Sequence, residues 1–167
     1  MDNKFPKEFL WGAATSAYQV EGAATTHGKK LSQQDVINKD SYERFGFATA
    51  EIASDEYHHY KEDVALMKEI GFKAYRFSIA WSRVFPDGTG PVNEEGIQYY
   101  RDLIDELKAN DIEPIVTLYH YDLPMALVDK YDGWISREVV KDFEYYARYV
   151  INEFKDKVNI GQQSMNK

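Results

Sequence analysis

The chain has 167 residues, of which 44% are hydrophobic and 15% aromatic, so we expect one globular domain with a sizeable buried core. Its formal charge of -8 disfavours binding to nucleic acid or to an anionic membrane. The sequence contains no cysteine, which excludes disulfides and thiolate chemistry, and its start lacks the apolar run of a signal peptide. We therefore expect a cytoplasmic protein without a membrane span, a metal or a cofactor.

Short apolar runs alternate with longer amphipathic runs, which is typical of β/α units on a parallel sheet. The runs predict strands over residues 9–15, 74–81 and 115–120, and helices over 54–70, 94–109 and 137–155. Residues positioned to begin the three helices are Ser54, Asn93 and Ser136. The fold class is therefore α/β with about three β/α units.

Two segments do not follow the repeat. Residues 22–49 are polar and predict an unusually long loop, which is a common feature of functional sites. Residues 159–167 read as a polar tail without a strand pattern. We therefore expect the repeating domain to cover residues 1–158 and the tail to diverge from it.

Polar side chains gather where the three predicted strands end: Gln19 and Glu21, then Arg76, then His120 and Asp122. In β/α barrels this end of the sheet carries the active site. Each residue taken alone is better explained as a hydrogen-bonded polar group at a strand end. Their recurrence in consecutive units favours a shared site.

Four motifs give this pattern a family resemblance. They are FLWGAATSAYQVEG at residues 9–22, YKEDV at 60–64, YRFSIAWSR at 75–83 and HYDLP at 120–124. In sequence, order and spacing they resemble family 1 glycoside hydrolases over about residues 5–158. The resemblance implies the first part of a TIM (β/α)8 barrel and a retaining β-glycosidase.

The resemblance also implies roles for four residues. Gln19 and His120 would hydrogen-bond hydroxyls of the cleaved sugar, and Arg76 would pair with the nucleophilic carboxylate. Tyr121 stands where many members have tryptophan. It is therefore expected either to stack on the sugar or to be an ordinary aromatic residue at the barrel rim.

The family reaction uses two carboxyl groups about 5 Å apart. The resemblance places the acid/base on the fourth strand and the nucleophile on a later strand, whereas this sequence departs from the family after about Val158. We interpret Glu21, Asp63 and Asp122 as structural rather than as substitutes. The chain alone is therefore expected to be an inactive fragment.

Residues 28–36, GKKLSQQDV, are similar to the first loop of bacterial 6-phospho-β-glucosidases. The expected partner is therefore a phosphorylated disaccharide, with an unphosphorylated β-glucoside as the alternative. We expect Lys29 and Lys30 to be solvated loop charges.

A different class of function is an interaction module or complementing fragment that self-associates through the open barrel edges. A closed small domain is disfavoured, because a barrel needs ~250 residues.

Overall fold

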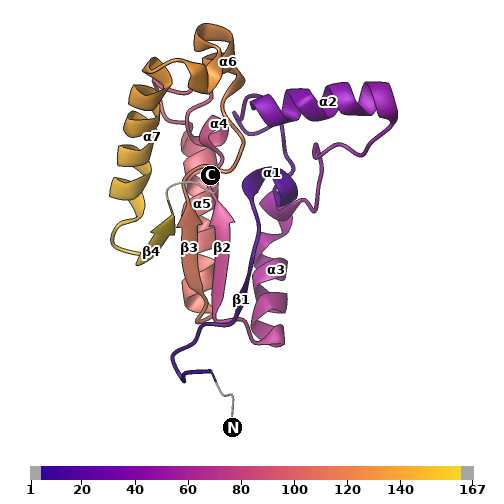
Figure 1. Ribbon diagram of the computed structural model, residues 1–167. Helices are drawn as coiled ribbons and strands as arrows, with labels where there is room; N and C mark the ends of the chain where they lie inside the picture. The colour runs from indigo at the N-terminus through magenta and orange to yellow at the C-terminus, as the bar shows by residue number, and fades with distance from the viewer. Residues whose placement is uncertain (1–4, 163–167) are drawn as a thin grey trace.

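The computed structural model describes residues 5–162 and contains a four-stranded parallel sheet. Its strands are β1 (Gly12–Ala14), β2 (Ala74–Ser78), β3 (Glu113–Thr117) and β4 (Ile160–Gln162), and they lie side by side in chain order (Figure 1). Arg76 of β2 is in register with Ala14 of β1 and Ile115 of β3, and Ile115 is in register with Ile160 of β4. The predicted parallel pairing is confirmed.

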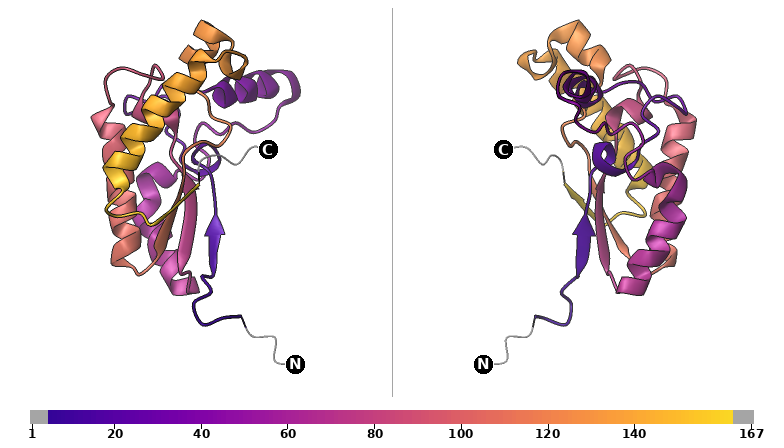
Figure 2. Two further views of the ribbon diagram at one scale, coloured as in Figure 1. Left: turned by 60° about the vertical axis from the view of Figure 1, so that its left-hand side comes forward. Right: turned by 90° about the vertical axis from the view of Figure 1, so that its right-hand side faces the viewer.

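The longest helices are α3 (Glu56–Ile70), α5 (Glu94–Ala109) and α7 (Glu138–Phe154), and they cover one face of the sheet (Figure 2). Their positions confirm the three predicted helices. The core lies between these helices and the sheet, and α5 contributes a buried stripe that includes Ile97, Tyr100, Ile104 and Leu107. Because side chains alternate along a strand, Tyr75 and Phe77 of β2 join this core while Arg76 belongs to the opposite face.

Shorter helical segments occupy the connections. They are α1 (Ala17–Val20), α4 (Trp81–Val84), α6 (Met125–Tyr131) and the 3-10 turn η1 (Gly133–Ile135). Gly96 lets α5 pack closely beside α4, since a Cβ atom there would lie 2.3 Å from the carbonyl oxygen of Arg83. None of the helices within residues 5–162 is long and apolar enough to cross a membrane.

The prediction of a single long loop over residues 22–49 is wrong, because the segment contains helix α2 (Gln33–Phe45). Ser32 begins this helix with a reciprocal cap: the Asp35 amide donates to Ser32 Oγ, and the Ser32 amide donates to Asp35 Oδ2. None of its residues is buried. In Figure 1, α2 lies beyond the carboxyl ends of the strands, away from the three large helices.

The prediction of a tail without a strand is also wrong for residues 160–162. These residues form β4, which pairs in parallel with β3 over Ile115–Thr117. The sequence here is short and contains a glycine, so it carries little strand pattern, and its order comes from pairing with β3. The rest of the predicted tail, residues 163–167, lies outside the described part of the chain.

The helix starts differ in detail from the prediction. Asp55 rather than Ser54 precedes α3, and Arg137 rather than Ser136 precedes α7, although Ser136 Oγ accepts a hydrogen bond from the Glu138 amide. Asn93 does precede α5, but its side chain does not cap the helix. Instead the side-chain Nδ2 of Asn93 donates to the carbonyl oxygens of His27 at 2.8 Å and Arg83 at 3.0 Å.

Candidate functional site

The candidate site lies at the carboxyl end of the sheet, on the face opposite to α3, α5 and α7. Gln19 is in α1 directly after β1, Arg76 is in β2, and His120 and Tyr121 follow β3. The strands are parallel, so these ends meet at the same edge of the sheet. The sequence expectation about their placement at the strand ends agrees with this arrangement.

Arg76 is fixed through its backbone, because its carbonyl oxygen accepts a 2.8 Å hydrogen bond from the Thr15 amide. Its side chain is half-buried, and its Nη1 atom is buried without a hydrogen-bond partner among the described residues. A buried donor without a partner costs about 1–3 kcal/mol, so such a group commonly serves a ligand or another part of the protein. Arg76 therefore presents a permanent positive charge on the uncovered face of the sheet.

His120 lies close enough to Arg76 for the guanidinium charge to affect its pKa. Burial and the nearby Arg76 guanidinium lower the pKa of His120, which favours the neutral imidazole. Its Nδ1 atom is buried and has no hydrogen-bond partner among the described residues. A neutral imidazole has one donor and one acceptor nitrogen, which suits contact with a hydroxyl group.

Tyr121 adopts a left-handed backbone conformation, with φ of 65°, directly beside His120. Its side chain is 55% exposed, and its ring meets the His120 ring edge to face at a centroid distance of 5.4 Å. The turn is held from below, since the His120 amide donates to Asp122 Oδ1 at 3.3 Å. The geometry allows Tyr121 to offer an aromatic face to the solvent side of the site.

Gln19 is exposed, and its Oε1 atom accepts a 2.8 Å hydrogen bond from Ser16 Oγ. The start of α1 is tied to β2, because the Ala17 amide donates to Ser78 Oγ at 2.7 Å. Within residues 5–162 no hydrogen bond joins Gln19 to Arg76 or His120. The structure therefore brings Arg76 and His120 together and leaves Gln19 at the same end of the sheet.

A buried polar network below the site was missed by sequence reasoning. Arg83 Nε donates to Glu21 Oε2 at 2.9 Å, and the Tyr100 hydroxyl donates to Glu21 Oε1 at 2.6 Å. Burial opposes the charge on Arg83, but the Glu21 carboxylate raises the pKa of Arg83 above its usual range. The network locks the end of α1 to α4 and α5. The only sign of this network in the sequence is that Arg83 ends the YRFSIAWSR motif.

The three carboxyl groups interpreted as structural lie away from the open face or inside the protein. Glu21 and Asp122 are only 3% and 2% exposed, and Asp63 is on α3. Lys29 was expected to be a solvated loop charge. This is wrong, because its ammonium group is buried in a 2.9 Å ion pair with Asp35 Oδ2. Lys30 remains at the surface, paired with Asp87. Across the described part of the chain, no cluster of His, Asp and Glu is arranged to hold a metal ion.

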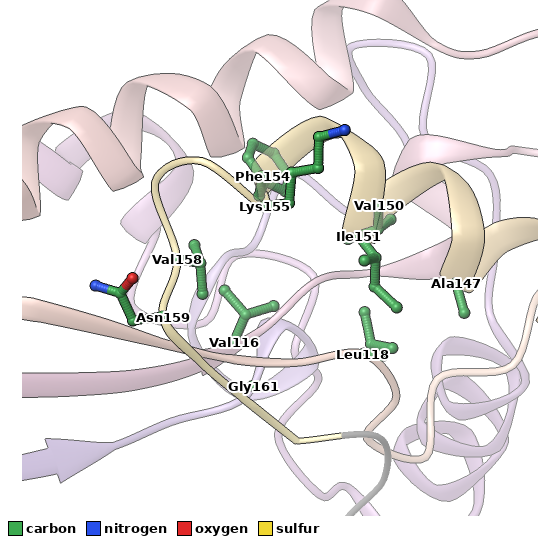
Figure 3. Close-up of a pocket in the computed structure, with 10 residues that line it drawn as sticks. All are labelled: Val116, Leu118, Ala147, Val150, Ile151, Phe154, Lys155, Val158, Asn159 and Gly161. Carbon is green, nitrogen blue, oxygen red and sulfur yellow. The ribbon is translucent and has the colours of Figure 1, made fainter.

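A second surface feature lies at the other edge of the sheet. Val116 and Leu118 face Ala147, Val150 and Ile151 of α7 across an apolar hollow of about 460 Å³ (Figure 3). The hollow is also bounded by Val158 and Gly161, next to β4.

At the opposite edge, beside β1, the exposed rings of Phe5, Phe9 and Trp11 pack together with centroid distances of 4.5–4.8 Å. Both edges therefore expose apolar side chains.

This chain is part of a (β/α)8 barrel, because its parallel strands lie in chain order, its helices cover one face and its polar groups gather at the carboxyl ends of the strands. The chain belongs to glycosyl hydrolase family 1, whose sequence profile matches residues 1–162. The resemblance inferred from the four motifs is thus confirmed. The profile match also includes residues 159–162, beyond Val158.

Several relatives show the extent of the similarity. The chain is 53% identical over 154 residues to aryl-phospho-beta-D-glucosidase BglC of Bacillus subtilis, covering 92% of this chain and 32% of that protein. It is 52% identical over 157 residues to beta-glucosidase 11 of Arabidopsis thaliana, covering 94% of this chain and 30% of that protein. The chain therefore spans about a third of the length of these relatives.

Solved structures agree with this partial coverage. A rice β-glucosidase superposes with a TM-score of 0.91 at 46% identity, covering 95% of this chain and 33% of that chain. The virulence factor SghA, in complex with its substrate analogue salicin, superposes with a TM-score of 0.91 at 41% identity. That match covers 96% of this chain and 35% of SghA.

Proposed function

We propose that this chain supplies the N-terminal part of the sugar-binding subsite of a retaining β-glycosidase that hydrolyses β-glucosides. Gln19 and His120 hydrogen-bond hydroxyls of the cleaved sugar, Arg76 orients the nucleophilic carboxylate, and Tyr121 contacts the sugar ring. The observation that carries the proposal is a pair of buried nitrogen atoms at the carboxyl end of the sheet, Arg76 Nη1 and His120 Nδ1, which have no hydrogen-bond partner within residues 5–162.

The chemistry of this pair suits its proposed roles. Arg76 is permanently charged, so it can keep a neighbouring carboxylate ionised and hold it by two parallel hydrogen bonds. The same charge, added to burial, lowers the pKa of His120 and keeps its ring neutral. A neutral ring can both donate to and accept from sugar hydroxyls, which themselves do both.

In this proposal the chain alone does not hydrolyse glycosides. Glu21 is held by Arg83 and Tyr100, and Asp122 is buried beneath the His120 turn. Neither carboxyl group is placed to act as the acid/base or the nucleophile of a two-carboxyl mechanism. Loss of both catalytic groups removes transition-state contacts that act together, so the defect is expected to span many orders of magnitude.

The substrate class within the family is inferred from one loop and from the relatives. One relative is an aryl-phospho-β-D-glucosidase and another is a β-glucosidase, and their identities to this chain are nearly equal. We favour 6-phospho-β-glucosides because of the similarity of the loop over residues 28–36. Lys29 is not a phosphate ligand in this proposal, since its ammonium group is buried against Asp35.

The test is an assay of the purified chain with aryl β-glucosides and their 6-phosphates, beside a full-length relative. We expect no turnover by the chain. We also expect small NMR shifts at His120 on addition of glucose or glucose 6-phosphate at millimolar concentrations, because few sugar contacts are present. Gln19→Ala should weaken this response, whereas Gln98→Ala, which removes an exposed glutamine on α5, should not.

Two results would contradict the proposal. Turnover approaching that of the relative, from protein free of contaminating glycosidase, would show that the chain holds usable catalytic carboxyl groups. Absence of any shift at His120 with both sugars would remove the sugar-binding role.

A second candidate function is a complementing fragment. The apolar hollow between α7 and β4 and the exposed rings of Phe5, Phe9 and Trp11 flank the two edges of the sheet. Such edges favour association with the remaining part of a barrel or with a second copy of the chain. Recovery of hydrolysis on mixing with the missing two thirds of a relative would support complementation.

A further inference from the structure

A small polar cavity lies next to Asp122, which follows the His120–Tyr121 turn, and its lining does not include Arg76 or His120. Its volume is about 10 Å³, and the residues around it include Tyr18 of α1, Ser32 at the start of α2, Lys29 and Asp122. A polar cavity of this size holds about one water molecule, provided that two or more polar groups face it.

Asp122 provides the first of these groups. Its side chain is 2% exposed, and its Oδ1 atom accepts the hydrogen bond from the His120 amide. The Oδ2 atom is buried and has no hydrogen-bond partner among the described residues. Burial raises the pKa of Asp122 to about 7, which agrees with a carboxyl group that receives too few hydrogen bonds.

Tyr18 provides the second group. Its hydroxyl is buried and, within residues 5–162, has no hydrogen-bond partner. Burial and the nearby Asp35 charge raise the pKa of Tyr18, although the neighbouring Gln34 side chain opposes this, so the hydroxyl keeps its proton and can donate it. Tyr18 and Asp122 both line the cavity but do not bond to each other.

The other polar groups around the cavity are already engaged. Lys29 Nζ donates to the carbonyl oxygens of Ala24 and Lys30 and to Asp35 Oδ2. Ser32 Oγ donates to Asp35 Oδ2. The two unsatisfied atoms of the lining are therefore a donor and an acceptor, which a single water molecule can join.

We propose that this cavity binds one water molecule, which accepts a hydrogen bond from the Tyr18 hydroxyl and donates one to Asp122 Oδ2. The water links helix α1 to the turn that carries His120 and Tyr121. Asp122 and the water would thereby position His120 without touching the sugar. The role in positioning His120 for sugar binding rests on the proposed function. The water site itself does not, because it involves no sugar.

The first test is a crystal structure of the full chain at a resolution that shows ordered water. We expect one water peak within hydrogen-bonding distance of both Tyr18 Oη and Asp122 Oδ2. A direct hydrogen bond between the two side chains, or a cavity with no density, would overturn the proposal. A rubidium soak separates water from a monovalent cation, and anomalous signal in the cavity would also overturn it.

The second test uses amide hydrogen exchange and needs no sugar. Tyr18→Phe removes one hydroxyl, and loss of the bridge should make the His120 amide exchange about fivefold faster, as expected for one hydrogen bond. Tyr60→Phe is the matched control, since Tyr60 is also half-buried but lies between α3 and α5, where its ring packs on Tyr99, and it does not line the cavity. Equal exchange rates at His120 in Tyr18→Phe and the wild type would disprove the link to the turn. The result for sugar binding does not affect this outcome.

Discussion

Arg83 and Glu21 form an ion pair, with Nε 2.9 Å from Oε2, in which the two side chains are 0% and 3% exposed. The pair joins residues 62 positions apart and is completed by Tyr100, whose hydroxyl donates to the same carboxylate. The Arg83 guanidinium also lies over the Tyr57 ring, 4.4 Å from its centroid. The end of α1, α3, α4 and α5 thus meet around one buried charge pair.

We predict that Arg83→Met lowers the free energy of unfolding by about 3–5 kcal/mol, because the Glu21 charge is left buried without its partner. The measurement is urea unfolding followed by circular dichroism. Adding Glu21→Gln to Arg83→Met should restore part of the loss, since no unpaired charge then remains. Arg148→Met removes an exposed ion pair with Glu144 and should cost at most about 1 kcal/mol. Similar losses for Arg83→Met and Arg148→Met would refute this account of the pair.

A second prediction concerns pH. Glu56 is 4% exposed and receives hydrogen bonds from the Tyr75 and Tyr99 hydroxyls. Burial raises its pKa from 4.5 to about 7, with a further contribution from the Glu21 charge, while the tyrosine hydrogen bonds lower it. Between these two pH values the native state keeps a proton that the unfolded chain has lost. Glu56 therefore makes stability fall as pH rises through this window, by about 3 kcal/mol at most.

Glu56→Gln should remove this contribution. The difference in unfolding free energy between Glu56→Gln and the wild type should then shift in favour of the variant from pH 4.5 to pH 7. The lowered pKa of His120 makes stability rise with pH, and the raised pKa of Asp122 makes it fall. Both contributions are present in the variant and in the wild type, so they cancel in the difference. Glu69→Gln, at an exposed position on the same helix, should give a flat difference. A flat difference for Glu56→Gln as well would show that Glu56 titrates normally.

A third prediction concerns association through the apolar hollow. Ile151 lines the hollow and is 55% exposed, and Val140 is equally exposed on the same helix α7 but does not line it. If the hollow contacts a second copy, sedimentation velocity should show concentration-dependent association of the wild type. Ile151→Lys should weaken this association because it places a charge in an apolar contact, while Val140→Lys should leave it unchanged. Equal effects of the two variants would argue against the hollow as the contact surface.

A fourth prediction concerns the strained turn of the site. Tyr121 has a φ of 65°, which glycine adopts without the Cβ clash of other residues. Tyr121→Gly should therefore be more stable than Tyr121→Ala by about 1 kcal/mol, as measured by urea unfolding. At Tyr145, in the middle of α7, the order should reverse, with glycine about 1 kcal/mol less stable than alanine. The same order at both positions would mean that the turn relaxes when Tyr121 is replaced.

The sequence predicts the parts of this fold that have a strong hydrophobic period. Helices α5 and α7 have one buried stripe each, and β2 alternates between the core and the open face, so their positions were predictable. Helix α2 has no buried residue and so no such stripe, and its only local signal is the spacing of Ser32 and Asp35. Strand β4 is three residues long and depends on its neighbour β3.

The site shows a similar division. The positions of Arg76 and His120 at strand ends follow from the pattern, because strand order brings those ends together. The sequence pattern does not predict the partners of Glu21 and Lys29, because a charged residue carries no local signal of whether it is solvated or forms an ion pair. Lys29 was expected to be solvated for this reason, and its burial against Asp35 depends on α2, which was not predicted.

The order of the strands in the sheet has a consequence for synthesis on the ribosome. Because β1, β2, β3 and β4 lie side by side in chain order, each new strand adds to an edge that has already emerged. The Glu21–Arg83–Tyr100 network is complete once residue 100 has left the ribosome, before β3 is available. The first two β/α units can therefore hold their buried charges in place while the nascent chain is still growing.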